Sequence, residues 1–330
     1  MRGGVMMQSS ARPEFSARDA SPPATSLPPI PEQQNWRDIT YTARDGLRLY
    51  ARHYPAPGSR LRPVVCLAGL TRNSRDFHDI ASVLSSAAQP HPRHVYALDY
   101  RGRGRSAYDP DWRNYQVLNE LLDVLDFMTI AGLADAAIIG TSRGGILAMV
   151  MAAARPGNIG AVVLNDIGPL IEREGLLRII SYVGRVPLPA TWREAGELVR
   201  SMNERQFPAV PDHMWESIAR QFYSDEDGRP AHGYDQALNK SASVLDGPLP
   251  ELWPQFKALS SIPAMVLRGE MSDILSVATA ERMQREHPDL ELLTVAGQGH
   301  APLLRDQASI LAIRDFLSRA DATWHGHHIG

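Results

Sequence analysis

A serine stands between closely spaced glycines at residues 140–145, which read Gly-Thr-Ser-Arg-Gly-Gly. An apolar segment precedes this pattern at residues 136–140, and a segment with helical patterning follows it at residues 145–154. Glycines permit the tight strand-to-helix turn of a G-x-S-x-G motif, because a Cβ at the flanking positions would clash. At such a turn the hydroxyl is exposed at a helix N-terminus, whose partial positive charge favours a developing anion. We predict that Ser142 is a nucleophile.

A serine hydroxyl is a weak nucleophile, so it needs a base, and the base needs a group that orients it. His300 follows the last apolar segment of the chain, in the stretch Gly-Gln-Gly-His-Ala-Pro. Asp273 follows the apolar segment before it, and Asp166 ends an earlier one. We predict His300 as the base and Asp273 as the acid, with Asp166 as the competing acid. The resulting order Ser, Asp, His along the chain differs from that of chymotrypsin and of subtilisin.

The elements that must position these residues alternate along the chain. Residues 39–54 are typical of a hairpin that turns at Asp45-Gly46. Six nearly continuous apolar segments are typical of buried parallel strands: 63–70, 94–99, 136–142, 161–166, 264–270 and 290–297. Amphipathic stretches lie between them, at 77–88, 114–130, 145–154, 279–287 and 308–320. This alternation predicts an α/β fold with a mostly parallel, doubly wound sheet that starts with an antiparallel hairpin.

Residues 168–250 interrupt the alternation with helical patterning, several aromatic residues and no further clear strand. This interval far exceeds the roughly 2 to 6 residues of an ordinary connection between a strand and a helix. We predict a helical cap there, inserted into a core formed by residues 36–167 and 251–320. Residues 1–35 are rich in proline and poor in apolar side chains, so we expect a flexible tail. Residues 321–330 are expected to form a C-terminal tail.

The composition argues against several classes of protein. The 34 basic and 37 acidic residues give a net charge of −3, which offers no attraction to nucleic acid. No window is long and apolar enough for a transmembrane helix, and the N-terminal segment lacks the apolar run of an export signal. The single cysteine, Cys66, excludes an intramolecular disulfide and lies within a predicted strand, where it is expected to be buried. We expect a cytoplasmic protein, with no nucleic-acid or membrane partner, and leave a homodimer open.

Weaker signals concern arginines and histidines. Six arginines lie near the predicted site: Arg72, Arg75, Arg101, Arg103, Arg105 and Arg143. One of them could recognise a substrate carboxylate, since a guanidinium pairs with it bidentately, or all could form structural pairs with Asp76, Asp79 or Asp99. His91 and His94 have the spacing of metal ligands but lack acidic or cysteine partners. We predict no metal and no cofactor.

Five motifs in order resemble the α/β-hydrolase superfamily, in particular its capped serine esterase and lipase-like branch. They are residues 66–74, 99–106, 140–145, 267–275 and 297–304. The resemblance covers residues 36–320 and implies the triad Ser142, Asp273 and His300. It also implies an oxyanion hole formed by the backbone N–H groups of Leu70 and Arg143. Many relatives have His-Gly in the first motif, where this chain has Ala68-Gly69.

The residues and the resemblance together predict a carboxylesterase that acts through an acyl-enzyme on a small to medium hydrophobic ester. Haloalkane dehalogenases and epoxide hydrolases share the architecture but attack with an aspartate, so Ser142 argues against both. A lactonase, a thioesterase and a C–C bond hydrolase would use the same triad and remain open. A non-catalytic receptor with this fold would usually carry a damaged triad.

Overall fold

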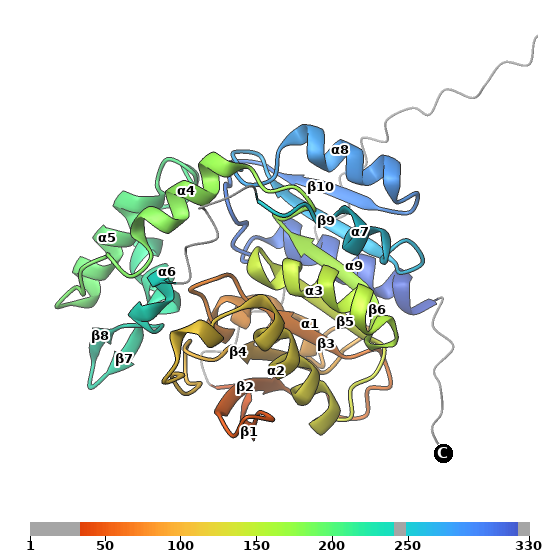
Figure 1. Cartoon of the computed structure of the whole chain (residues 1–330), viewed down its shortest axis with the longest axis horizontal. Coiled ribbons are helices and arrows are strands. Elements are labelled where there is room, and N and C mark those ends of the chain that lie inside the picture. Colours follow the sequence, from red (N-terminus) through yellow and green to blue (C-terminus); the bar gives the residue numbers. More distant parts are fainter. Residues whose placement is uncertain (1–33, 241–248, 323–330) are drawn as a thin grey trace, which may run out of the picture.

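Eight strands form one sheet in a computed structural model that describes residues 34–240 and 249–322 (Figure 1). Their order is β1-β2-β4-β3-β5-β6-β9-β10. The hairpin is β1 (Arg37–Thr42) and β2 (Arg48–Tyr54), and β2 also pairs antiparallel with β4 (Val95–Asp99). The other pairs are parallel and involve β3 (Val64–Leu67), β5 (Ala136–Thr141), β6 (Ile159–Asn165), β9 (Ala264–Gly269) and β10 (Glu291–Val295). The predicted fold class is confirmed.

The central strands are buried because helices cover both faces of the sheet. Every residue of β3, β6 and β9 is buried, which explains why these segments are almost continuously apolar. Figure 1 shows α2 and α3 on one face and α1 and α9 on the other. These four helices are α1 (His78–Ser85), α2 (Val117–Ile130), α3 (Arg143–Ala154) and α9 (Gln307–Ala322), and α8 (Val277–Glu286) lies beside β10. Short 3-10 helices add η1 (Ser74–Phe77), η2 (Trp112–Asn114) and η3 (Pro156–Asn158).

The chain between β6 and β9 forms a separate group of elements beside one end of the sheet (Figure 1). It contains α4 (Arg173–Tyr182), α5 (Trp192–Asn203), η4 (Asp212–Met214) and α6 (Trp215–Phe222), and α7 (Trp253–Lys257) leads back to the core. We refer to residues 168–250 as the cap. Its described part has an apolar core of its own that includes Trp192, Val199, Trp215 and Ile218.

The cap also holds a small hairpin that we did not expect. Strands β7 (Ser224–Glu226) and β8 (Arg229–Ala231) pair antiparallel, and Asp227 and Gly228 form their turn with positive φ angles of 50° and 79°. Three-residue strands are too short for an alternating apolar pattern, so no periodicity marks them in the sequence. The cap, predicted as helical, therefore also contains a short hairpin.

Two of the predicted tails fall largely outside the described part of the chain. The structure describes only residues 34 and 35 of the tail predicted at 1–35, and residues 321 and 322 of the one predicted at 321–330. Across residues 34–240 and 249–322, no helix has the length and apolar character needed to span a membrane.

Candidate active site

Ser142 lies in a tight turn between β5 and α3. Its φ of 51° falls in the left-handed region that non-glycine residues rarely adopt. The flanking glycines make the turn possible: a Cβ on Gly140 would lie 2.6 Å from the Gly144 carbonyl, and one on Gly144 would lie 2.0 Å from the Leu67 carbonyl oxygen. The turn projects the Ser142 side chain into a pocket, as predicted from the motif.

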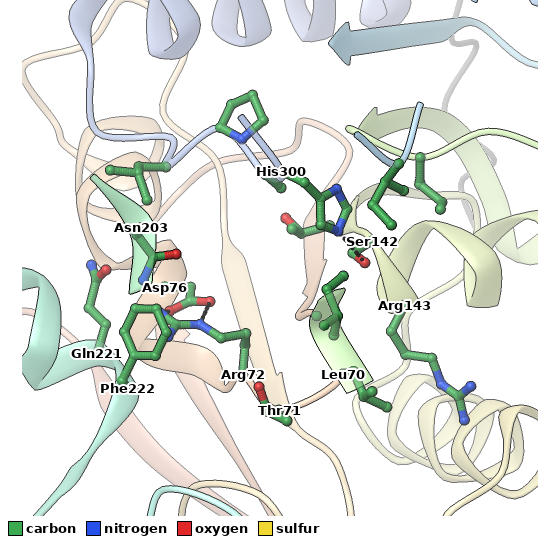
Figure 2. A pocket seen from close by; sticks show the side chains of 18 of the residues that line it. Leu70, Thr71, Arg72, Asp76, Ser142, Arg143, Asn203, Gln221, Phe222 and His300 are labelled. Atoms are coloured by element: carbon green, nitrogen blue, oxygen red, sulfur yellow. Dashed lines mark hydrogen bonds and ion pairs between the residues drawn. The ribbon is translucent and has the colours of Figure 1, made fainter. Parts of the chain in front are cut away.

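His300 connects Ser142 to an acid. Its Nε2 lies 2.9 Å from Ser142 Oγ (Figure 2). Its Nδ1 lies 2.8 Å from Asp166 Oδ2. Asp166 is fully buried and also accepts hydrogen bonds from the Gly269 N–H at 2.7 Å and the Ser272 hydroxyl at 2.6 Å. These bonds fix the carboxylate, so Asp166 holds the imidazole with Nδ1 as the donor.

The acid beside His300 is therefore Asp166, and the prediction of Asp273 for this position is corrected. In the sheet β6 lies directly beside β5, so the residue after β6 emerges next to the turn that carries Ser142. Asp273, in the loop after β9, instead forms an ion pair with Arg178 of α4 at 2.6 Å. The carboxylate predicted for the triad is thus paired with Arg178 of the cap.

The predicted oxyanion donors have suitable local geometry. Arg143 is the first residue of α3, so its N–H has no acceptor within the helix. The Gly69 carbonyl accepts a hydrogen bond from the Arg72 N–H at 3.1 Å. A trans peptide directs its N–H opposite to its carbonyl, so the Leu70 N–H points away from that turn. Gly69 also lies close to the nucleophile, since a Cβ there would be 3.9 Å from Ser142 Cβ.

A buried ion network, which the sequence analysis missed, joins the two donor segments. Arg103 Nε donates to the Leu70 carbonyl at 2.9 Å, and Arg103 Nη2 lies 2.8 Å from Glu120 Oε1. Glu120 Oε2 in turn accepts from Arg143 Nε at 2.7 Å. Burial raises the pKa of Glu120, but the charges of Arg103 and Arg143 outweigh it and leave the pKa below its usual value. Glu120 is therefore ionised at neutral pH and holds both segments.

The pocket around Ser142 is mostly apolar and has a volume of about 200 Å³. The core contributes Leu70, Ile146 and Ile274 to its lining, and the cap contributes Ile179, Trp215 and Phe222. This volume is below the roughly 300–1,000 Å³ of sites for drug-sized ligands. Among the aromatic residues of the cap, Trp192 and Tyr223 pack in the cap core, whereas Trp215 packs there and also lines the pocket.

Most of the nearby arginines are engaged in structural pairs. The ion pairs are Arg72 with Asp76, Arg101 with Asp45, Asp109 and Asp123, Arg103 and Arg143 with Glu120, and Arg105 with Asp38. Arg75 is mostly buried, and burial lowers the pKa of its guanidinium. Figure 2 shows that the Arg143 side chain points away from Ser142. Five of the six arginines therefore form structural ion pairs, but only Arg72 pairs with one of the three aspartates named from the sequence.

The remaining candidates lie apart from this chemistry. Cys66 is fully buried in β3, and burial raises the pKa of its thiol. His94, just before β4, pairs with His53 of β2, with 2.9 Å between His94 Nδ1 and His53 Nε2. Over the described ranges, no group of three or more His, Cys, Asp or Glu residues is arranged to hold a metal ion.

The model of the alpha/beta hydrolase family matches residues 64–312, which is most of the chain. The chain belongs to the alpha/beta hydrolase family. Within this family, it is 39% identical to an alpha/beta hydrolase from Novosphingobium aromaticivorans whose crystal structure superposes with a TM-score of 0.80. That match covers 87% of this chain and 99% of the other.

Curated hydrolases are similar to this alpha/beta hydrolase over most of their length. The 3-hydroxybutyrate-oligomer hydrolase of Cupriavidus necator is 27% identical, over 83% of this chain and 94% of its own. The sn-1-specific diacylglycerol lipase ABHD11 of Mus musculus is 24% identical, over 86% of this chain and 84% of its own. The family is thus established, and these relatives differ from one another in their named substrates.

Proposed function

We propose that this alpha/beta hydrolase is a serine carboxylic-ester hydrolase that acts on a small to medium, largely apolar ester. The observation that carries the proposal is the chain of contacts from Ser142 Oγ through His300 to Asp166, with distances of 2.9 and 2.8 Å. The similarity to a diacylglycerol lipase agrees with it, since a diacylglycerol contains carboxylic ester bonds.

In the proposed mechanism, His300 Nε2 takes the Ser142 proton as the oxygen attacks the ester carbonyl. The N–H groups of Leu70 and Arg143 stabilise the tetrahedral oxyanion. His300 then protonates the leaving alcohol, and an acyl-enzyme on Ser142 remains. Water activated by His300 releases the acid, while Asp166 stabilises the imidazolium that forms in each step.

The apolar lining supports a substrate that is mostly hydrocarbon on at least one side of the ester. Burial of this hydrocarbon in the pocket contributes about 25 cal/mol of binding free energy for each Å² of apolar surface removed from water. The relatives named above suggest esters of hydroxy acids or of glycerol as further candidates. Lactones and thioesters place a similar carbonyl before Ser142 and belong in the same panel of substrates.

The test is hydrolysis of p-nitrophenyl esters of increasing acyl length, alongside simple lactones and thioesters. We expect turnover of short to medium acyl esters that Ser142→Ala reduces by about 10⁴-fold or more. Turnover of esters that is unchanged in Ser142→Ala would contradict the proposal. Preferred turnover of lactones or thioesters would replace the ester assignment by one of the alternatives.

A further inference from the structure

The pocket has a second polar region that the proposed reaction does not use. It is formed by Asn203, the last residue of α5, and Gln221 in α6. Figure 2 shows these two amides near Phe222 and Arg72, across the pocket from Arg143, with Ser142 and His300 between the two sides. We call Asn203 and Gln221 the amide pair.

Gln221 is held firmly while its side-chain amide stays unpaired. The residue is only 9% exposed, and its backbone carbonyl accepts a hydrogen bond from Asn73 Nδ2 at 3.1 Å. Asn73 is itself fully buried in the core, so this bond anchors α6 to the loop after β3. Within residues 34–240 and 249–322, the side-chain amide of Gln221 has no hydrogen-bond partner. Because Gln221 lines the pocket, this amide is available to a polar group of a bound molecule.

Asn203 presents an acceptor beside it. Its Nδ2 donates a hydrogen bond to the Val199 carbonyl at 2.7 Å. This bond orients the amide and leaves Oδ1 free to accept a hydrogen bond. No donor to this oxygen is found in the described part of the chain. The amide pair thus offers both a donor and an acceptor to a molecule in the pocket.

The charges beside the amide pair cancel. Arg72 Nε donates to Asp76 Oδ2 at 2.8 Å, and Arg72 Nη2 pairs with the other carboxylate oxygen. The Arg72 guanidinium also stacks on Phe222, with Cζ 3.3 Å from the ring centroid. Since Asp76 neutralises Arg72, this side of the pocket gives little stabilisation to a buried carboxylate.

We propose that the amide pair is a subsite for an uncharged hydroxyl group on the substrate, away from the ester that Ser142 attacks. A hydroxyl donates one hydrogen bond and accepts others, which matches the free acceptor of Asn203 and the free amide of Gln221. The substrate class is then a hydroxy ester whose hydroxyl lies on either the acyl or the alcohol side. This inference rests on the proposed ester hydrolase function and refines its substrate.

The test compares pairs of esters that differ only by a terminal hydroxyl. Methyl hexanoate and methyl 6-hydroxyhexanoate probe the acyl side, and pentyl acetate and 5-hydroxypentyl acetate probe the alcohol side. Acid release in a pH-stat gives kcat/KM for each ester. The variants are Gln221→Met, which keeps the length of the side chain, and Gln221→Leu. Gln284→Leu on the exposed face of α8 makes the same kind of change far from the pocket.

For one of the two pairs, we expect the ratio of hydroxylated to plain ester to fall about 5- to 10-fold in both Gln221 variants, which is the usual worth of a hydrogen bond. The ratio should stay constant in Gln284→Leu. Unchanged ratios for both pairs in the Gln221 variants would overturn the subsite while leaving the ester hydrolase function intact. If the wild-type protein hydrolyses p-nitrophenyl esters but none of these four esters, the subsite is contradicted and the function is not. If it hydrolyses neither kind of ester, the function is contradicted as well.

Discussion

Asp273 and Arg178 form a bidentate ion pair between the core and the cap. The two carboxylate oxygens of Asp273 lie 2.6 and 2.9 Å from Nε and Nη2 of Arg178. Burial raises the pKa of Asp273, but hydrogen bonding and the charge of Arg178 outweigh it and leave the pKa below its usual value. Two aspartates at the ends of neighbouring strands therefore have different contacts. Asp166 forms a hydrogen bond with His300, and Asp273 forms an ion pair with Arg178 of α4.

Because Asp166 and Asp273 have different partners, we predict different effects when each is replaced by asparagine. Asp166→Asn should lower kcat by about 10⁴-fold, because the amide no longer stabilises the imidazolium or its tautomer. Asp273→Asn should reduce kcat far less. Steady-state hydrolysis of one p-nitrophenyl ester by both variants is the measurement. A larger loss of kcat in Asp273→Asn would favour Asp273 as the acid.

The ion pair also predicts that the cap and the core are coupled. Leu176 and Ile179 of α4 line the pocket, so loosening α4 should raise KM more than it lowers kcat. We expect Asp273→Asn and Arg178→Met to be non-additive in kcat/KM. Their coupling should be up to about 1 kcal/mol, as for other partly exposed pairs. A double-mutant cycle measures it, and purely additive effects would argue against a cap held by this pair.

Glu120 is predicted to position the oxyanion donors. In Glu120→Gln the charge that joins Arg103 to Arg143 is lost, so the Leu70 and Arg143 segments are held less firmly. We expect kcat to fall by about 10-fold, which is less than the 10²- to 10³-fold loss for a whole oxyanion donor, with little change in KM. Binding of a boronic acid that mimics the tetrahedral intermediate should weaken in parallel.

Asp123→Asn is the control for this prediction. Asp123 is also buried on α2 and pairs with Arg101 at 2.6 Å, so its loss destabilises the same helix without touching the donors. Both variants should lower the melting temperature. If Asp123→Asn lowers kcat and inhibitor affinity as much as Glu120→Gln does, Glu120 has only a structural role.

A histidine pair predicts how stability depends on pH. Burial, together with the charges of His94 and Arg37, lowers the pKa of His53 from 6.5 to about 4. Between these values the unfolded chain binds a proton that the folded chain does not, so the free energy of unfolding falls as the pH drops below 6.5. His53→Gln should flatten this dependence.

Urea unfolding at several pH values between about 7.5 and 5 measures the effect on both proteins, a range that lies above the titration of most carboxylates. The same substitution at His213, which is exposed on η4, serves as the control. Equal slopes of stability against pH in the wild type and His53→Gln would contradict the prediction.

The sequence was sufficient for the features that depend on local pattern. Continuous apolar segments identified the buried strands, and glycine spacing identified the turn at Ser142, because both are set by neighbours along the chain. The choice between Asp166 and Asp273 depends on strand order and on Arg178 of the cap, which no local pattern reveals. The amide pair and Glu120 were missed for the same reason, since their contacts join segments that are far apart in sequence.

The central claim is that Ser142 is an activated nucleophile, and labelling with a fluorophosphonate tests it most directly. Intact-mass spectrometry after incubation, followed by peptide mapping, reports the adduct and its position. The account predicts one adduct on Ser142 in the wild-type protein, none in Ser142→Ala, and much slower labelling in Asp166→Asn than in Asp273→Asn. A wild-type protein that forms no adduct at Ser142 would contradict it.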